Sequence, residues 1–137
     1  MVNHARLVAT SSFLPEQVED NASLAESFPE WSAEKIGSKT GIHQRHIARP
    51  DEYVSDLAVA AARRLAVEHG VDLSTVDHLI VCTQAADFYM PVTAAIVHAQ
   101  LGMRPDCGAN DINLGCSGFI YGLGLAKGLI ESGQADN

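Results

Sequence analysis

From residue 54 onward, helical and strand patterns alternate along the chain, and this alternation constrains the fold more than any other feature. Between Val54 and Gly70 the apolar residues recur at the spacing of one helical face, and Gly70 is a typical stop. The stretch "DHLIVCTQ" (Asp77 to Gln84) is short, apolar and rich in β-branched residues, which is typical of a strand buried on both faces. The helical stripe comprises Val54, Leu57, Ala58, Ala61, Ala62 and Leu65.

The same alternation continues to the end of the chain. Pro91 stands where a helix would begin, and "VTAAIVHAQLG" predicts a helix that ends at Gly102. "CGANDIN" predicts a strand, and "SGFIYGLGLAKGLIESG" predicts another helix. Strands alternating with helices indicate an α/β layered fold. A further strand is expected after "ESGQADN", so we expect the chain to be a piece of something larger.

The N-terminal third has weaker signals. Arg6 to Ser12 predicts a first strand, stopped by Pro15. Two short helices are expected within "EDNASLAESFPEWSAEKIGSKTGI", capped by Asn21 and Ser32 and ended by a turn at "TG". "HQRHIARPDEY" lacks clean periodicity and is expected to be an exposed loop.

Composition excludes several classes of protein. With 137 residues, of which 47% are hydrophobic and 19% charged, the chain can form one compact domain. It has no apolar run long enough to span a membrane and no secretory leader, so the expected location is cytoplasmic. A formal charge of −8 argues against nonspecific binding to nucleic acid. An acidic carrier protein or a coenzyme could still dock on a small basic patch.

The cysteines are three in number and contain no C-x-x-C pair, which makes a disulfide framework or a structural zinc site improbable. Cys82 lies in the middle of an apolar strand and is expected to be a core residue. Cys107 lies in a turn and is assigned no role. Cys116 differs, because it falls between a strand and a helix and is surrounded by small residues in "LGCSG".

A thiol at the start of a helix faces unpaired N–H groups and the positive end of the helix dipole, which favour a thiolate. We expect Gly115 to permit a strained turn and Gly118 to let another backbone or a substrate approach closely. The arrangement parallels the nucleophile elbow, although Leu114 replaces its first glycine. An amide at this corner would serve as an oxyanion donor. These features favour Cys116 as a nucleophile over Cys116 as a core residue.

Several segments together carry a family likeness. "INLGCSGFIYGL" resembles the active-site cysteine segment of β-ketoacyl-acyl-carrier-protein synthase III and its thiolase-like relatives. The segments "SSFLPEQVEDNASL", "KTGIHQRHIARPDEYVSDLAVAAARRL", "LIVCTQAADFYMP" and "AAIVHAQLG" resemble further blocks of that family in the same order. The resemblance implies a homodimer in which each subunit pairs two αβαβα-type halves. Residues 1–137 match the first half of this thiolase-like fold.

The resemblance also implies a reaction. Cys116 would take an acyl group from acyl-coenzyme A and then condense it with malonyl-acyl carrier protein, with loss of carbon dioxide, in fatty acid biosynthesis. Acyl-coenzyme A is a substrate here, and no cofactor is implied. A thiolate suits the step because it is a good nucleophile for a thioester.

Three other residues correspond to positions with a role in the family. Lys39 stands where the family usually has an arginine near coenzyme A, and Trp31 resembles a tryptophan that stacks on adenine, the alternative being a packing residue. Met90 matches a residue that reaches across the dimer and closes the acyl pocket, the alternative being a methionine that fills the core. The family's catalytic His and Asn belong to the half that this chain lacks.

The histidines of this chain match none of the family motifs. His43 and His46 are spaced like a metal pair, but no third ligand is evident, and we interpret them as loop histidines. Three alternatives to the condensing enzyme remain. They are a thiolase-fold acyltransferase of secondary metabolism, an inactive truncated chain that serves as an interaction module, and a hydrolase in which Ser117 rather than Cys116 is the nucleophile.

Overall fold

The computed structural model describes residues 4–137, which form two compact units. Unit 1 contains the N-terminal segment up to Phe13 together with Tyr53–Asn137, and unit 2 contains Leu14–Glu52. Each unit is described by itself below.

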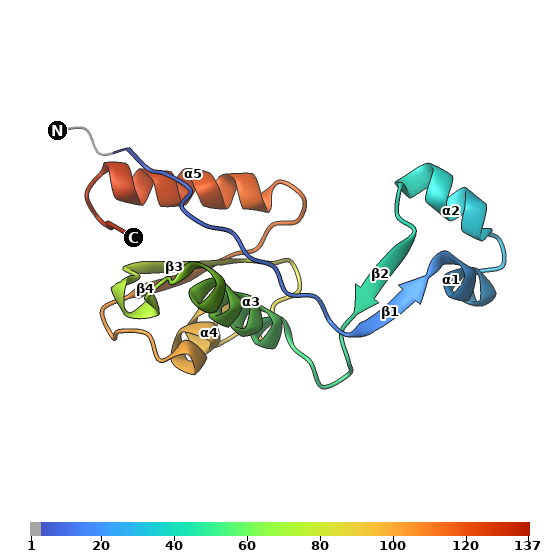
Figure 1. The fold of residues 1–137 in the computed structure, drawn as a ribbon, viewed down its shortest axis with the longest axis horizontal. Helices are drawn as coiled ribbons and strands as arrows, with labels where there is room; N and C mark the ends of the chain where they lie inside the picture. Colours follow the sequence, from blue (N-terminus) through green and yellow to red (C-terminus); the bar gives the residue numbers. More distant parts are fainter. Residues whose placement is uncertain (1–3) are drawn as a thin grey trace. The chain divides into compact units, whose positions relative to one another are not determined.

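Unit 1 contains the alternation predicted from the sequence. Its two strands, β3 (His78–Cys82) and β4 (Gly108–Ile112), pair in parallel, with His78 opposite Gly108 and Cys82 opposite Ile112. In Figure 1 helices α3 and α4 lie on one side of this pair and α5 lies on the other. The helices of this unit are α3 (Val54–His69), the short 3₁₀ helix η1 (Leu73–Thr75), α4 (Thr93–Leu101) and α5 (Gly118–Glu131).

The core of unit 1 lies between the strand pair and the helices α3 and α4. Val59, Val81, Ala94 and Val97 form its buried centre. The face toward α5 is open, because a groove of about 460 Å³ separates part of α5 from the sheet. The prediction that β3 is buried on both faces is therefore wrong, since Val81 is its one buried residue. Partly buried neighbours of the centre are Ala58, Leu79, Leu101 and Ala109.

Two helices of unit 1 begin at carboxylates that come from distant parts of the sequence. Asp87 Oδ1 accepts hydrogen bonds from the N–H groups of Val54 and Ser55 at 2.9 and 3.3 Å. Asp111, on β4, accepts from the N–H groups of Thr93 and Ala94 at 2.8 and 2.7 Å. Because the first N–H groups of a helix lack partners within the helix, these contacts define where α3 and α4 start.

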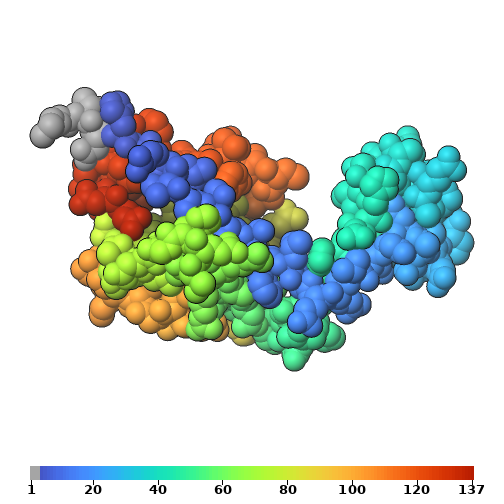
Figure 2. All heavy atoms as spheres, viewed as in Figure 1, coloured from blue at the N-terminus to red at the C-terminus, as the bar shows by residue number. Residues whose placement is uncertain are grey.

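The predicted strand from Arg6 to Ser12 is wrong. Within residues 4–13 no backbone group bonds to a neighbouring strand. Side chains of α3 hold the segment instead, because the Thr10 carbonyl lies 2.9 Å from His69 Nε2 and the Ser11 hydroxyl donates to Glu68 at 2.7 Å. Figure 2 shows this segment, in dark blue, lying along the surface of unit 1. An extended segment becomes a strand only when a backbone ladder pairs with it.

Unit 2 contains a two-stranded antiparallel sheet and two helices, which connect the two strands in the sequence. The loop predicted for "HQRHIARPDEY" is wrong over part of its length, because β2 (Gln44–Ile47) pairs with β1 (Gln17–Asp20). Both strands are mostly polar and neither contains a buried residue, so neither shows the alternation that would predict it. The helices are α1 (Asn21–Ser27) and α2 (Ala33–Thr40).

The caps of these helices test the sequence predictions. Ser32 caps α2, as predicted, and Gly41 ends it in the left-handed conformation with φ 69°. The predicted cap at Asn21 is wrong, because the carboxylate of Asp20 accepts from Ser23 N–H at 2.8 Å, and this bond lowers the pKa of Asp20. Asn21 is buried instead and donates to the Ile42 carbonyl at 2.8 Å.

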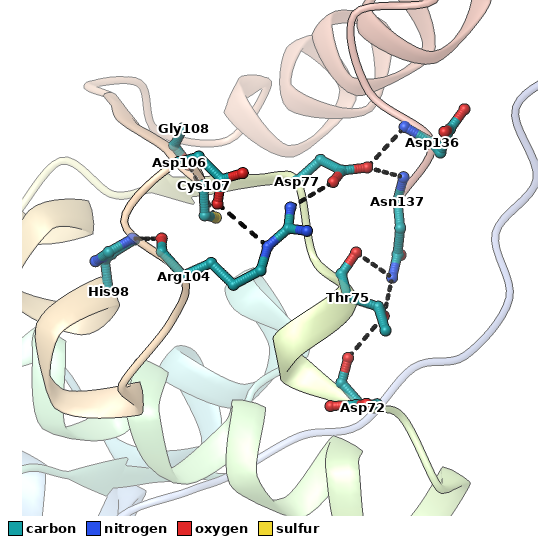
Figure 3. A network of polar contacts seen from close by, with 10 residues as sticks. All are labelled: Asp72, Thr75, Asp77, His98, Arg104, Asp106, Cys107, Gly108, Asp136 and Asn137. Atoms are coloured by element: carbon teal, nitrogen blue, oxygen red, sulfur yellow. Dashed lines mark hydrogen bonds and ion pairs between the residues drawn. The ribbon is translucent and has the colours of Figure 1, made fainter.

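The residues after α5 return to the start of β3, as Figure 3 shows. Asp77 Oδ2 accepts from the N–H groups of Asp136 and Asn137 at 2.9 and 3.0 Å, and its Oδ1 lies 2.7 Å from Arg104 Nη2. These hydrogen bonds, those from Asp136 and Asn137 first and that from Arg104 after them, lower the pKa of Asp77. Asp77 therefore joins three segments of unit 1. Across the described part of the chain, no helix is both long and apolar enough to cross a lipid bilayer.

Candidate active site

Cys116 lies in a short turn between β4 and α5, at the corner that the sequence predicts. Gly118 N–H donates to the Gly115 carbonyl at 2.9 Å, so Cys116 and Ser117 occupy the two central positions of a hydrogen-bonded turn. Cys116 is exposed, and α5 begins two residues after it. The turn therefore presents a thiol to solvent beside the first N–H groups of a helix.

The two glycines of this turn have a different role from the one expected. Gly115 does not have positive φ, so the expectation of a strained turn at this residue is wrong. Space requires glycine at position 118, whereas at Gly115 the neighbour is the end of a flexible side chain. A methyl group at Gly115 would overlap Gln84 Oε1, and one at Gly118 would overlap Cys82 Sγ. In both cases the two atoms would lie closer than 3.0 Å, a distance that real Cβ atoms essentially never show.

Cys82 is not the core residue that the sequence predicts. It is exposed at the end of β3, and its thiol lies 3.7 Å from the Leu114 carbonyl. The prediction fails because the strand ends here, next to the turn that carries Cys116, rather than continuing into the core. Cys107 is the buried thiol, with 7% of its surface exposed, and burial raises its pKa.

A hollow of about 420 Å³ lies at the carboxyl ends of β3 and β4. Ligands of parallel α/β sheets bind at this end of the strands, which makes the hollow a candidate substrate site. Met90 belongs to the exposed segment that borders it and is 72% exposed, so in this structure it does not fill the core. The hollow is lined by Thr83, Gln84, Ala86, Phe88, Tyr89, Val92, Asp111 and Asn113.

Trp31 and Lys39 both belong to unit 2, where Lys39 lies in the last turn of α2 and Trp31 just before the α2 cap. The ammonium of Lys35 lies 4.2 Å from the centre of the Trp31 ring, a cation–π contact. Lys35 was missed by the sequence reasoning, although its i, i+4 spacing from Lys39 places both on one face of α2. Trp31 is 41% exposed and borders an apolar pocket of about 280 Å³ with Leu24, Phe28 and Ile36.

The histidines are engaged elsewhere. His46 lies on β2, which corrects its interpretation as a loop residue, and its Nδ1 is 2.6 Å from the Pro15 carbonyl. His78 Nε2 is 2.6 Å from Asn110 Oδ1 within the strand pair of unit 1. Across residues 4–137 no cluster of three or more His, Cys, Asp and Glu side chains could hold a metal ion.

The sequence of this chain is similar to a known family of enzymes. The family model described as 3-oxoacyl-[acyl-carrier-protein] synthase III matches residues 110–137. A β-ketoacyl-[acyl-carrier-protein] synthase III 2 from Staphylococcus epidermidis is 45% identical over 134 residues, which cover 98% of this chain and 40% of that protein. A β-ketoacyl-[acyl-carrier-protein] synthase III from Xanthomonas oryzae is 38% identical and covers 96% of this chain and 40% of that protein.

Solved structures of synthase III proteins are also similar to this chain. A crystal structure of a 3-oxoacyl-(acyl-carrier-protein) synthase III superposes with a TM-score of 0.90 and 48% identity, covering 96% of this chain and 39% of that one. The synthase III of Thermus thermophilus gives 0.87 and 40% identity over 96% of this chain and 40% of that one. The chain thus spans about two fifths of the length of the relatives it matches. The thiolase-like α/β fold predicted from the sequence is confirmed as a partial half of that fold.

Proposed function

From its likeness to the 3-oxoacyl-acyl-carrier-protein synthase III family, which is confirmed over nearly the whole chain, we propose that this chain carries the acyl-accepting cysteine of such an enzyme. In this proposal Cys116 Sγ attacks the thioester carbonyl of an acyl-coenzyme A. The bond between that carbonyl and the coenzyme A sulfur then breaks, and coenzyme A leaves as its thiol. The exposed thiol in the turn between β4 and α5 is the observation that carries the proposal.

The turn supplies a reason for acylation at this position. The carbonyl oxygen gains negative charge during the attack, and N–H groups aimed at that oxygen lower the barrier. The N–H groups of Cys116 and Ser117 make no hydrogen bond within residues 4–137, and both lie at the start of α5. We infer that one or both stabilise the developing oxyanion. The helix dipole of α5 favours the same charge.

The coenzyme A portion is assigned to unit 2. Lys35 and Lys39 provide two positive charges on one face of α2, in a chain whose formal charge is −8. Trp31, beside the apolar pocket of this unit, offers a ring on which an adenine stacks. Lys39 attracts the phosphates as a point charge, since a lysine lacks the flat stacking surface of an arginine.

Met90 is assigned to the acyl pocket of a second subunit. The segment that carries it presents three exposed apolar side chains in a row, with 54%, 99% and 72% of their surfaces exposed for Phe88, Tyr89 and Met90. A solvated loop seldom carries so much apolar surface unless a partner covers it. A homodimer in which Met90 reaches into its partner accounts for this exposure.

The remaining catalytic groups are assigned to protein beyond residues 1–137, which we propose form the first half of the two-half fold. On α5, Phe119, Ile120 and Tyr121 are 63%, 67% and 65% exposed, and a second half would cover them. The His and Asn that act on malonyl-acyl carrier protein would belong to that half. The complete protein would then condense the acyl group with the malonyl unit in fatty acid biosynthesis.

The proposal is tested by intact mass spectrometry of the protein made from its natural gene, before and after exposure to short acyl-coenzyme A. The expected result is a gain of one acyl mass that maps to the peptide containing Cys116 and disappears in Cys116→Ala. Ser117→Ala is the matched control, because the Ser117 side chain makes no capping hydrogen bond, and it should keep the adduct. An adduct that depends on Ser117 would support the hydrolase alternative, and no adduct in the natural protein would overturn the proposal.

A further inference from the structure

The turn that carries Cys116 rests on the end of β3 at both of its ends. Gly118, its last residue, lies against Cys82, and Gly115, its first residue, lies against Gln84. Backbone hydrogen bonds tie the same segments together, since Thr83 N–H donates to the Ile112 carbonyl at 3.1 Å. The thiol of Cys82 lies 3.7 Å from the carbonyl of Leu114, at the entry to the turn.

We propose that Cys82 and Gln84 are positioning residues, which fix where the turn that carries Cys116 lies relative to the end of β3. This inference rests on the proposed role of Cys116 as the nucleophile. Neither residue would touch the substrate in this role. They act through the two glycines, whose missing side chains leave the space that Cys82 and Gln84 occupy.

The two contacts differ in stiffness, which predicts unequal effects. Gln84 meets Gly115 with the far end of a flexible side chain, which can move away from an added methyl group at low cost. Cys82 has a short side chain fixed to a paired strand residue, so a methyl group at Gly118 would have to displace the turn itself. We therefore expect the contact between Cys82 and Gly118 to control the position of Cys116 more strongly.

A compensating pair of substitutions tests the inference. Gly118→Ala should slow acylation of Cys116 by roughly 10- to 100-fold, the loss expected when a reacting group is displaced by about 1 Å. Cys82→Ala in addition removes the overlap with sulfur, leaves the tight 3.0 Å contact with Leu114 Cβ, and should restore most of the rate. Gly122→Ala is the matched control, because it lies one turn further along α5 and its methyl group would make only an ordinary 3.6 Å contact with Ile112.

A second readout separates this inference from the proposed function. The rate at which iodoacetamide labels each cysteine is measured by peptide mass spectrometry, which requires no acyl-coenzyme A. In Gly118→Ala the labelling rate of Cys116 should change and then return in the double variant. Labelling of Cys107 should stay slow throughout, because that thiol is buried and reports unfolding.

The outcomes are distinct. If the natural protein forms no acyl adduct, the proposed function fails, while the labelling of Cys116 still decides whether Cys82 positions the turn. Equal behaviour of Gly118→Ala and Gly122→Ala would overturn the positioning role. So would a loss that the second substitution does not restore, or a rise in Cys107 labelling that persists in the double variant, since both would reveal a folding contact only.

Discussion

Replacing Asp111 by Ala should destabilise unit 1 strongly, and more than the loss of the exposed carboxylate of Asp106 does. The carboxylate of Asp111 accepts from the N–H groups of Thr93 and Ala94 at 2.8 and 2.7 Å, and both of these residues are 0% exposed. Alanine would leave two buried donors at the start of α4 without a partner. An unsatisfied buried donor costs about 1–3 kcal/mol, and a lost helix cap costs roughly 0.5–2 kcal/mol.

These two costs describe the same pair of bonds, so they overlap and do not add in full. We expect a loss of about 2–4 kcal/mol for Asp111→Ala and roughly 1–2 kcal/mol for Asp111→Asn, which keeps one oxygen acceptor. The assay is equilibrium unfolding in urea followed by circular dichroism. With a denaturant dependence of about 2 kcal/mol per M, the alanine variant should lower the midpoint by roughly 1–2 M.

Asp106→Ala is the matched control for the loss of charge. Its side chain is 76% exposed and makes an ion pair with Arg104 Nε at 3.3 Å, so its removal should cost at most about 1 kcal/mol. If Asp111→Ala shifts the midpoint no more than Asp106→Ala does, then the carboxylate of Asp111 does not hold the start of α4. The argument from buried donors would then be wrong.

Three further predictions concern reactivity, acid stability and coenzyme binding. Near neutral pH, iodoacetamide should label Cys116 faster than Cys82 or Cys107, and peptide mass spectrometry that finds equal rates for all three would count against a reactive site at the helix start. Because folding lowers the pKa of Asp77 below its ordinary 3.8, its stabilising contribution is present above that pH and is lost as the pH falls through the folded pKa. Unfolding curves at about pH 5 and about pH 3 should therefore differ less in Asp77→Asn than in the wild type, and an unchanged difference would contradict the assignment. Lys39→Ala should raise the KM for acyl-coenzyme A by roughly two- to fivefold at low salt with kcat unchanged, and an effect on kcat alone would remove Lys39 from coenzyme binding.

The elements predicted correctly from the sequence are those whose pattern reflects their own burial. The helix predicted from Val54 to Gly70 is confirmed, although its buried residues are Ser55 and Val59 and, of the predicted stripe, Ala58 packs against the core. Gly70 and Gly102 end their helices in the left-handed conformation. Cys116 was located at its corner by the change from strand to helix. In these cases the local sequence and the tertiary contacts demand the same residue types.

The elements that were missed depend on partners that the local sequence does not identify. Strand β2 exists because β1 pairs with it, and neither has an apolar face that would reveal the pairing. Cys82 was predicted to be a core residue because its neighbours in the chain are apolar. Its contact with Gly118 involves a later segment of the chain, which the local sequence does not identify. The contact between Cys82 and Gly118 could be found only once both segments were in place.

The capping of α3 and α4 by distant carboxylates has a consequence for how the chain folds as it is synthesised. A ribosome releases the N-terminal residues first. The N–H of Val54 therefore lacks its partner until Asp87, 33 residues later, has been synthesised, and the N–H of Thr93 lacks its partner until Asp111, 18 residues later, has been synthesised. Asp77 likewise receives the N–H of Asn137, which comes 60 residues later. The first N–H groups of α3 and α4 therefore stay without partners until a later segment docks. Nascent chains halted before Asp111 should contain an α4 whose first turn is frayed.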